Sequence, residues 1–137
     1  MTTMKAPKVT KCIYERIYDR LNRLTGGINE FVAEHRSLKL QSKGFMDLTI
    51  ESFGYNGKLA LTHYYLLNGD LVPDPDMEIL VHPEMKMAEA LTYQDTFGFK
   101  TVYLDDDRRQ FYPSRKKELN QFLNTWLNNL QKQGFYK

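Results

Sequence analysis

The spacing of apolar residues changes twice along this chain, and this change limits the fold more than any other feature. From residue 11 to residue 24 apolar side chains recur every three or four positions, which is the period of an α-helix. From residue 45 to residue 105 apolar and polar side chains alternate in short runs, as in strands of a half-buried sheet. The helical period returns from residue 114. Strands in a row between helices, without β-α-β alternation, predict an α+β fold with an antiparallel sheet.

Three segments carry the helical pattern. The first, "KCIYERIYDRLNRL", follows a potential cap at Thr10 and ends at Gly26 and Gly27. The second, "INEFVAEHRSLKL", is weaker, and its polar tail from residue 37 to residue 44 favours a loop. The last begins with a potential cap at Ser114 and stops near Gly134. Its apolar stripe consists of Leu119, Phe122, Leu123, Trp126, Leu127 and Leu130.

The alternating region divides into about five strands that follow one another as a meander. They are "FMDLTIESF", "LALTHYYLL", "MEILVH", "MAEALTYQ" and "FGFKTVYLD". Asn56-Gly57 and Asn68-Gly69 predict tight hairpin turns, because Asn-Gly tolerates positive φ at both central positions. "DLVPDPD" predicts a loop, since Pro73 and Pro75 each lack a backbone donor. We expect the N-terminal helices and the long C-terminal helix to cover one face of the sheet. The other face would carry Asp47, Glu51, Thr62, Tyr64, Glu78 and His82.

Composition favours one soluble domain over residues 1–137. The net charge is only +2, whereas a dedicated nucleic-acid binder usually has a stronger basic excess. The single cysteine, Cys12, excludes an intramolecular disulfide and a cysteine zinc site, and a lone cysteine is most often inert. The apolar runs are too short to span a membrane, and "MTTMKAPKVT" lacks the apolar core of a signal peptide. We therefore expect a cytoplasmic protein without a cofactor.

The stretch "HYYLLNGDLVPDPDMEILVHPEMK" concentrates acidic residues in the middle of the chain. Asp70, Asp74, Asp76 and Glu78 are of the type that binds Mg²⁺ or Ca²⁺ through oxygen. Their spacing does not match an EF-hand loop, and the two prolines limit their convergence. We interpret the stretch as a stiff acidic hairpin whose Asp side chains bond nearby backbone amides.

A second interpretation of the same stretch is a metal-dependent hydrolase or nuclease. Asp76 followed by Glu84-Met85-Lys86 resembles the acid and Glu-x-Lys set in which two carboxylates hold a metal. The spacing is short, and Pro83 beside Glu84 indicates a turn, not a strand. The alternative function would use Asp74, Asp76, Glu78 and Glu84, and we rank it below binding.

Histidine beside a carboxylate could act as a general base. Alternation places Glu78 and His82 on one face of a strand and turns His63 toward the core, where histidines are usually hydrogen-bonded structural residues. Glu51 is a further carboxylate on the predicted open face. The sequence carries no serine elbow or oxyanion loop, so we predict no catalytic constellation.

Basic and aromatic residues mix near the start of the last helix. They are Lys100, Arg108, Arg109, Arg115, Lys116 and Lys117, with Tyr103, Phe111 and Tyr112 among them. Basic side chains bind phosphates and aromatic rings stack on bases. Three aspartates at 105–107 lie inside this patch and would offset its field, so direct nucleic-acid binding ranks below protein binding.

Tyrosines are numerous for a core of this size. Tyr55, Tyr64, Tyr93 and Tyr112, with the C-terminal "GFYK", supply aromatic area of the kind enriched at recognition surfaces. The alternative is that these rings pack at the sheet edge and under the helices.

Several segments resemble a known family in order and spacing. They are "LNRL", "GFMDLTIES", "HYYLLNGDLVPDPDME", "HPEMKMAEAL", "FGFK" and "NQFLNTWL". On these segments the chain resembles the YqiB-like proteins, a bacterial family of unknown function, and is similar to a neighbouring family of bacteria, phages and mobile elements. The resemblance implies a compact cytoplasmic domain and brings no activity, cofactor or catalytic residue with it.

These patterns favour a non-enzymatic binding or adaptor protein that acts through the acidic hairpin and the open sheet face. The expected contact residues are Asp70, Asp74, Asp76, Glu78, Tyr64 and His82. The expected partner is a protein, in one version with a basic nucleic-acid-binding surface that the acidic side chains would occupy. Similarity to phage and mobile-element proteins suggests an inhibitor of a host defence nuclease.

Overall fold

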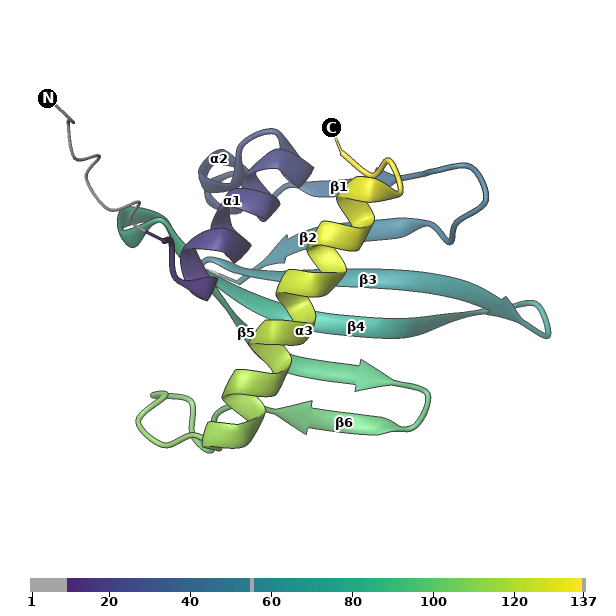
Figure 1. Ribbon diagram of the computed structural model, residues 1–137. Helices are drawn as coiled ribbons and strands as arrows, with labels where there is room; N and C mark the ends of the chain where they lie inside the picture. Colours follow the sequence, from purple (N-terminus) through teal and green to yellow (C-terminus); the bar gives the residue numbers. More distant parts are fainter. Residues whose placement is uncertain (1–9, 55, 137) are drawn as a thin grey trace, which may run out of the picture.

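The computed structural model describes residues 10–54 and 56–136 and has an α+β fold (Figure 1). Two short helices, α1 (Ile13–Thr25) and α2 (Ile28–Ala33), come first. The described residues then form six strands: β1 (Ser37–Leu40), β2 (Leu48–Phe53), β3 (Lys58–Leu67), β4 (Asp70–His82), β5 (Met87–Asp95) and β6 (Gly98–Thr101). A 3-10 helix, η1 (Pro83–Met85), joins β4 to β5, and the long helix α3 (Pro113–Lys132) closes the fold.

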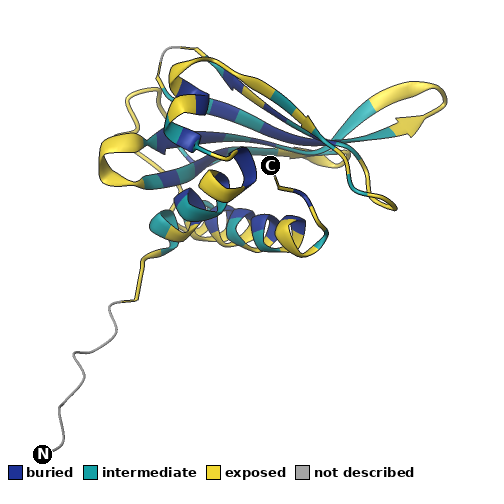
Figure 2. Cartoon of the chain, turned by 90° about the horizontal axis from the view of Figure 1, so that it is seen from above, coloured by how far each residue is buried: buried dark blue, intermediate teal, exposed yellow. Residues whose placement is uncertain are grey.

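The sheet is an antiparallel meander in which every strand pairs with the next one in sequence. Helices α1 and α3 pack against each other and against β5, so the helices cover one face of the sheet (Figures 1 and 2). This confirms the predicted α+β class, the antiparallel sheet and the C-terminal helix.

Alternation along the strands sends apolar side chains to the covered face. The strand residues of the buried core are Leu48, Ile50, Leu59, Leu61, Met77, Ile79, Val81, Ala88 and Ala90. The opposite, open face carries two rows of paired residues that cross the sheet. One row is Glu51, Ala60, Glu78, Thr92 and Thr101, and the other is Thr49, Thr62, Asp76, Gln94 and Phe99. Thus Glu51, Thr62 and Glu78 lie on the open face, as the alternation predicts.

The buried stripes of the helices agree with the prediction better than the residues at which the helices begin. Ile17, Leu21 and Leu24 of α1 are buried, and Gly26 ends the helix at φ +75°. The cap of α1 is Cys12, not Thr10, and its backbone N–H donates to the Glu15 carboxylate at 3.1 Å. None of the described helices is long and apolar enough to cross a membrane.

Helix α3 begins one residue before its predicted cap. Pro113 occupies its first turn, and Tyr112, not Ser114, is the cap residue. Proline suits this position because the first helical N–H groups have no partner inside the helix. The predicted stripe is otherwise buried, with Phe122 the exposed exception.

The sheet has six strands where the sequence predicted about five. The additional strand is β1, in the segment expected to be a loop after the second helix. Leu38 and Leu40 alternate with Ser37 and Lys39, and Leu38 pairs with Ile50 of β2. Four residues are too few for alternation to stand out in a sequence, so pairing with β2 decides their conformation.

The expected loop "DLVPDPD" is also wrong, because these residues are the first half of strand β4. Pro73 pairs with Tyr64, and the register of β3 and β4 shifts between Thr62 and Tyr64. Pairing between β4 and β5 starts only at Asp76, so the proline-containing half of β4 has a neighbour on one side alone. Prolines are tolerated in edge strands and at bulges, which explains their presence here.

Candidate functional site

The β3–β4 hairpin extends past the other strands and past the helices (Figures 1 and 2). Its turn is Asn68-Gly69, with φ of +52° and +87°, which confirms the predicted tight turn. Near the turn Leu66 faces Leu71, and these side chains are 72% and 67% exposed. The next pair on the same face is Tyr64 and Pro73. We name these four residues, Tyr64, Leu66, Leu71 and Pro73, the hairpin stripe.

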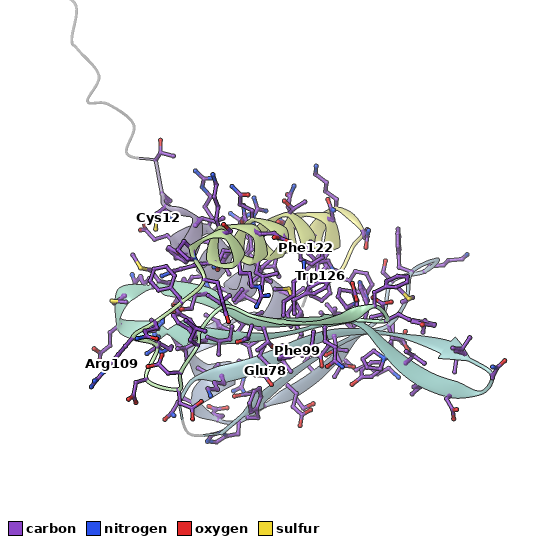
Figure 3. All side chains as sticks on the ribbon, turned by 90° about the horizontal axis from the view of Figure 1, so that it is seen from below. Cys12, Glu78, Phe99, Arg109, Phe122 and Trp126 are labelled. Carbon is purple, nitrogen blue, oxygen red and sulfur yellow. The ribbon has the colours of Figure 1, made fainter. Side chains whose placement is uncertain are left out.

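Acidic side chains continue the same open face toward the centre of the sheet. Asp76 accepts a hydrogen bond of 2.8 Å from the buried Thr62 hydroxyl, and Glu78 lies beyond it, on the side of the sheet away from α3 (Figure 3). Asp70 differs from these two, because it lies at the turn opposite Leu67 and alternation puts it on the other face of the hairpin. Among the described residues no lysine, arginine or histidine forms an ion pair with these acids. Their negative charge is therefore available to a partner.

Asp74 lies apart from the other acids. Its carboxylate accepts a hydrogen bond of 2.6 Å from the Thr96 hydroxyl, which also bonds the Tyr65 hydroxyl at 3.2 Å. This contact ties the hairpin to the turn between β5 and β6.

The four carboxylates of the alternative nuclease interpretation do not converge. Asp74, Asp76 and Glu78 lie along one extended strand, whereas Glu84 lies in η1, past the end of that strand. Seven residues lie between Asp76 and Glu84, and a strand rises about 3.3 Å per residue. Within the described residues no three His, Cys, Asp or Glu side chains are grouped to hold a metal ion. These carboxylates could therefore hold a common cation only if the strand bent.

A polar cluster that the sequence did not reveal surrounds Glu89 at the end of the sheet. The Glu89 side chain is only 12% exposed, and it contacts His82 Nε2 at 2.6 Å and Arg108 Nη1 at 3.3 Å. Tyr103 Oη donates a further hydrogen bond to the same carboxylate. Because a carboxylate only accepts, His82 Nε2 carries the proton. Burial, followed by the bond to Glu89, raises the pKa of Tyr103 above its usual value.

A hollow of about 380 Å³ lies beside this cluster on the open face. Its charged lining residues are Lys58, Glu78, His82, Asp105, Asp106 and Arg108. Glu78 and His82 thus line one site, as their shared strand face predicted. Thr92 and Thr101 add hydroxyl groups to this lining, so the hollow offers hydrogen-bonding groups and side chains of both charges to a polar ligand.

His63 lies in the core, as its alternation predicted. Its ring lies 5.6 Å from the Trp126 ring and 5.7 Å from the Phe135 ring, between centroids. Its Nδ1 contacts the Asp47 carbonyl at 3.1 Å. Burial lowers the pKa of His63, and the contact with the Asp47 carbonyl opposes that change in part. His63 is thus a structural histidine on the covered side of the sheet.

The predicted tyrosine surface is not a single patch. Tyr64 belongs to the hairpin stripe, but Tyr93 packs edge-on against Phe122 of α3, with 5.2 Å between ring centroids. Tyr112 is half-exposed near the start of α3, under the Arg115 guanidinium at 4.4 Å. Tyr55 lies outside the described residues.

The sequence pattern did not reveal the Glu89 cluster, because its members are far apart in the chain. Glu89 alternates with Ala88 and Ala90 like any polar residue of a strand, and only the loop after β6 brings Tyr103 and Arg108 to it. Leu66 and Leu71 are exposed because their strands, β3 and β4, have 10 and 13 residues and extend beyond the shorter neighbouring strands. The loop predicted over residues 70–76 hid this extension.

Comparison with known proteins leads to one family. A family model described as "Domain of unknown function (DUF6908)" matches residues 16–136. No curated protein and no solved structure matches the chain. The matched span starts inside α1 and ends beyond α3, so it contains the whole sheet, the hairpin stripe and the Glu89 cluster. Because the match covers most of its length, the chain belongs to the DUF6908 family, a family of unknown function.

Proposed function

We propose that this chain is a non-enzymatic binding protein that contacts a protein partner through the β3–β4 hairpin and the adjoining open face. The observation that carries the proposal is the exposure of Leu66 and Leu71 on a hairpin that none of the described helices covers. Exposure of leucine side chains to water is unfavourable, and binding of a partner that covers them is stabilised by the burial of this apolar area. Tyr64 and Pro73 extend this apolar area along one face.

The charge of the surface suggests what kind of partner it suits. Asp76 and Glu78 continue the face of the hairpin stripe, Asp70 lies at the turn, and none of the three has a basic partner among the described residues. A basic protein surface would gain attraction from these acids and would cover the leucines at the same time. His82 and the hollow lie farther along the same face and could take part in a larger contact.

The finer version of the proposal is an inhibitor of a nucleic-acid-binding enzyme. Acidic side chains would occupy a basic surface in place of phosphates. A host defence nuclease is the proposed target, and this choice rests only on the resemblance of the sequence segments to a family of bacteria, phages and mobile elements. A cytoplasmic setting, in which such a nuclease would act, is part of the same proposal.

The test is affinity purification with variants that separate the hairpin from the fold. Leu66→Ser with Leu71→Ser removes the apolar pair, and Asp70→Lys with Glu78→Lys reverses the neighbouring charge. Met85→Ser is the matched control, because Met85 is 58% exposed but lies in η1, at the far end of β4. We expect the wild-type protein and the control to retain a stoichiometric partner that both double variants lose.

Two results would count against the proposal. One is repeated purification of the wild-type protein, from the cells that encode it, with no stoichiometric partner. The other is full retention of the partner by both double variants. Melting curves of each variant establish that a loss of binding is not a loss of folding.

A further inference from the structure

A groove of about 460 Å³ lies between the start of α1 and the first turns of α3. Four cationic side chains line it: Lys11 and Arg16 from the α1 region, and Lys116 and Lys117 from α3. The described residues that line it include no aspartate or glutamate. Sequence distance hid this arrangement, because about one hundred residues separate the two basic pairs.

Most of this positive charge is not neutralised. Lys11 forms an ion pair with Asp19 at 2.6 Å, and Glu15 is engaged by the Cys12 backbone N–H. Arg16, Lys116 and Lys117 form no ion pair with any described carboxylate. Three cations therefore remain for an anionic ligand.

Aromatic rings lie among these cations. Phe111 lines the groove, is 41% exposed and has the Lys116 ammonium 4.5 Å from its ring centroid. Tyr112 is similarly exposed beside it and carries the Arg115 guanidinium over its face. Cations next to exposed rings match both parts of a single-stranded nucleic acid, which offers phosphates and unpaired bases.

Two of the three aspartates at 105–107 line a different surface from this groove. Asp105 and Asp106 line the hollow on the open face, and neither lines the groove. The Asp105 carboxylate accepts the backbone N–H groups of Arg109 and Gln110, at 3.0 and 3.2 Å. Arg108 is paired with Glu89 and belongs to the hollow, not to the groove.

We propose that the groove between α1 and α3 binds the phosphate backbone of a single-stranded nucleic acid, with Phe111 stacking on a base. Arg16, Lys116 and Lys117 would each contact a phosphate. A short cationic groove within a chain of net charge +2 fits a few phosphates better than the long footprint of a duplex. This site is distinct from the hairpin stripe, so the chain could hold nucleic acid and a protein partner at once.

Fluorescence anisotropy with a mixed-sequence, 20-nucleotide, fluorescein-labelled DNA strand tests the proposal. The groove variant is Arg16→Glu with Lys117→Glu, and the matched control is Lys43→Glu with Lys132→Glu, at exposed positions outside the groove. Both variants change the net charge from +2 to −2, so they differ only in where the charge changes. Melting curves verify that all proteins are folded.

When the logarithm of the binding constant is plotted against the logarithm of the salt concentration, each phosphate contact to a single strand contributes about −0.7 to the slope. Three such contacts therefore predict a slope of about −2. We expect the groove variant to bind at least about tenfold more weakly at low salt, with a slope near −0.7, because one cation remains. The control should stay within about threefold of the wild type. Phe111→Ala should weaken binding by about fivefold or more without changing the slope, since stacking is not ionic.

Several results would overturn the proposal. They are the absence of saturable binding by the wild-type protein, an equal loss in the groove and control variants, and wild-type affinity in Phe111→Ala. Competition by phosphatidylserine vesicles at lower phosphate concentration than unlabelled single strands would assign the groove to a membrane surface instead. None of these outcomes depends on the hairpin, so they leave the protein-binding proposal separately testable.

Discussion

Replacing Asn120 by leucine tests whether one side chain closes a gap in the hydrogen bonding of the sheet. Asn120 lies on α3, is 1% exposed, and accepts the backbone N–H of Ala90 in β5 at 2.9 Å. It also donates to the Lys116 carbonyl at 2.7 Å. Pairing between β5 and β6 begins at Thr92, so no strand reaches the Ala90 N–H on that side. Asn120 takes the place of the missing strand.

The magnitude follows from what the substitution leaves behind. Leucine has the same branched shape and is somewhat larger, so it leaves no cavity, but the buried Ala90 N–H loses its acceptor. An orphaned buried donor costs about 1–3 kcal/mol, and leucine returns about 0.5 kcal/mol through its better helix propensity. We expect a net loss of about 0.5–2.5 kcal/mol in the free energy of unfolding. For a domain of this size that lowers the Tm by about 2–10 °C.

Thermal and urea unfolding, followed by circular dichroism, measure this loss. Asn129→Leu is the control, because Asn129 is an exposed asparagine on the same helix. Its free energy of unfolding should stay within about 0.5 kcal/mol of the wild type. If Asn120→Leu were as stable as Asn129→Leu, the Ala90 N–H would not depend on Asn120, and the reasoning would fail.

Two further predictions concern titratable groups. Burial lowers the pKa of His63 below 6.5, so as pH falls the unfolded chain takes up a proton before the folded chain does. The contribution of His63 to the free energy of unfolding is therefore fully present above pH 6.5 and is lost as pH falls from there toward the folded-state pKa. Melting at pH 7.5 and 5.5 should therefore show a smaller drop for His63→Gln than for the wild type, and equal drops would contradict the assignment. Glu89→Gln removes a charged acceptor from His82, Tyr103 and Arg108 and should cost about 1–3 kcal/mol, whereas the exposed Glu84→Gln should cost almost nothing in the same denaturant titration.

Periodicity predicted the parts of the fold that the core dictates. Ile17 and Leu21 of α1, and Leu123 and Leu127 of α3, are buried because a helix can hide only one stripe, and that stripe must be apolar. His63 was placed correctly because alternation fixes the face of a strand residue regardless of its polarity.

Periodicity failed where a contact distant in sequence decides the outcome. The sequence predicts a loop at Pro73 because proline is disfavoured in strands. Proline is tolerated there because β5 does not pair with this part of β4. The Glu89 cluster needs the loop at 103–108 to return to β5. The cationic groove needs α1 and α3 side by side. Contacts between segments distant in sequence depend on the fold and leave no pattern in the local sequence.

The division between buried and outlying segments also explains how this fold can separate stability from recognition. Leu59 and Leu61 in the inner half of β3 are fully buried in the core and cannot change without cost to the core. Leu66 and Leu71, a few residues farther along the same hairpin, have no described helix above them and contribute little to folding. The stability of the fold therefore does not explain why these positions hold leucine, because serine or threonine would be equally compatible with an exposed strand end. The partner contact that we propose would account for them.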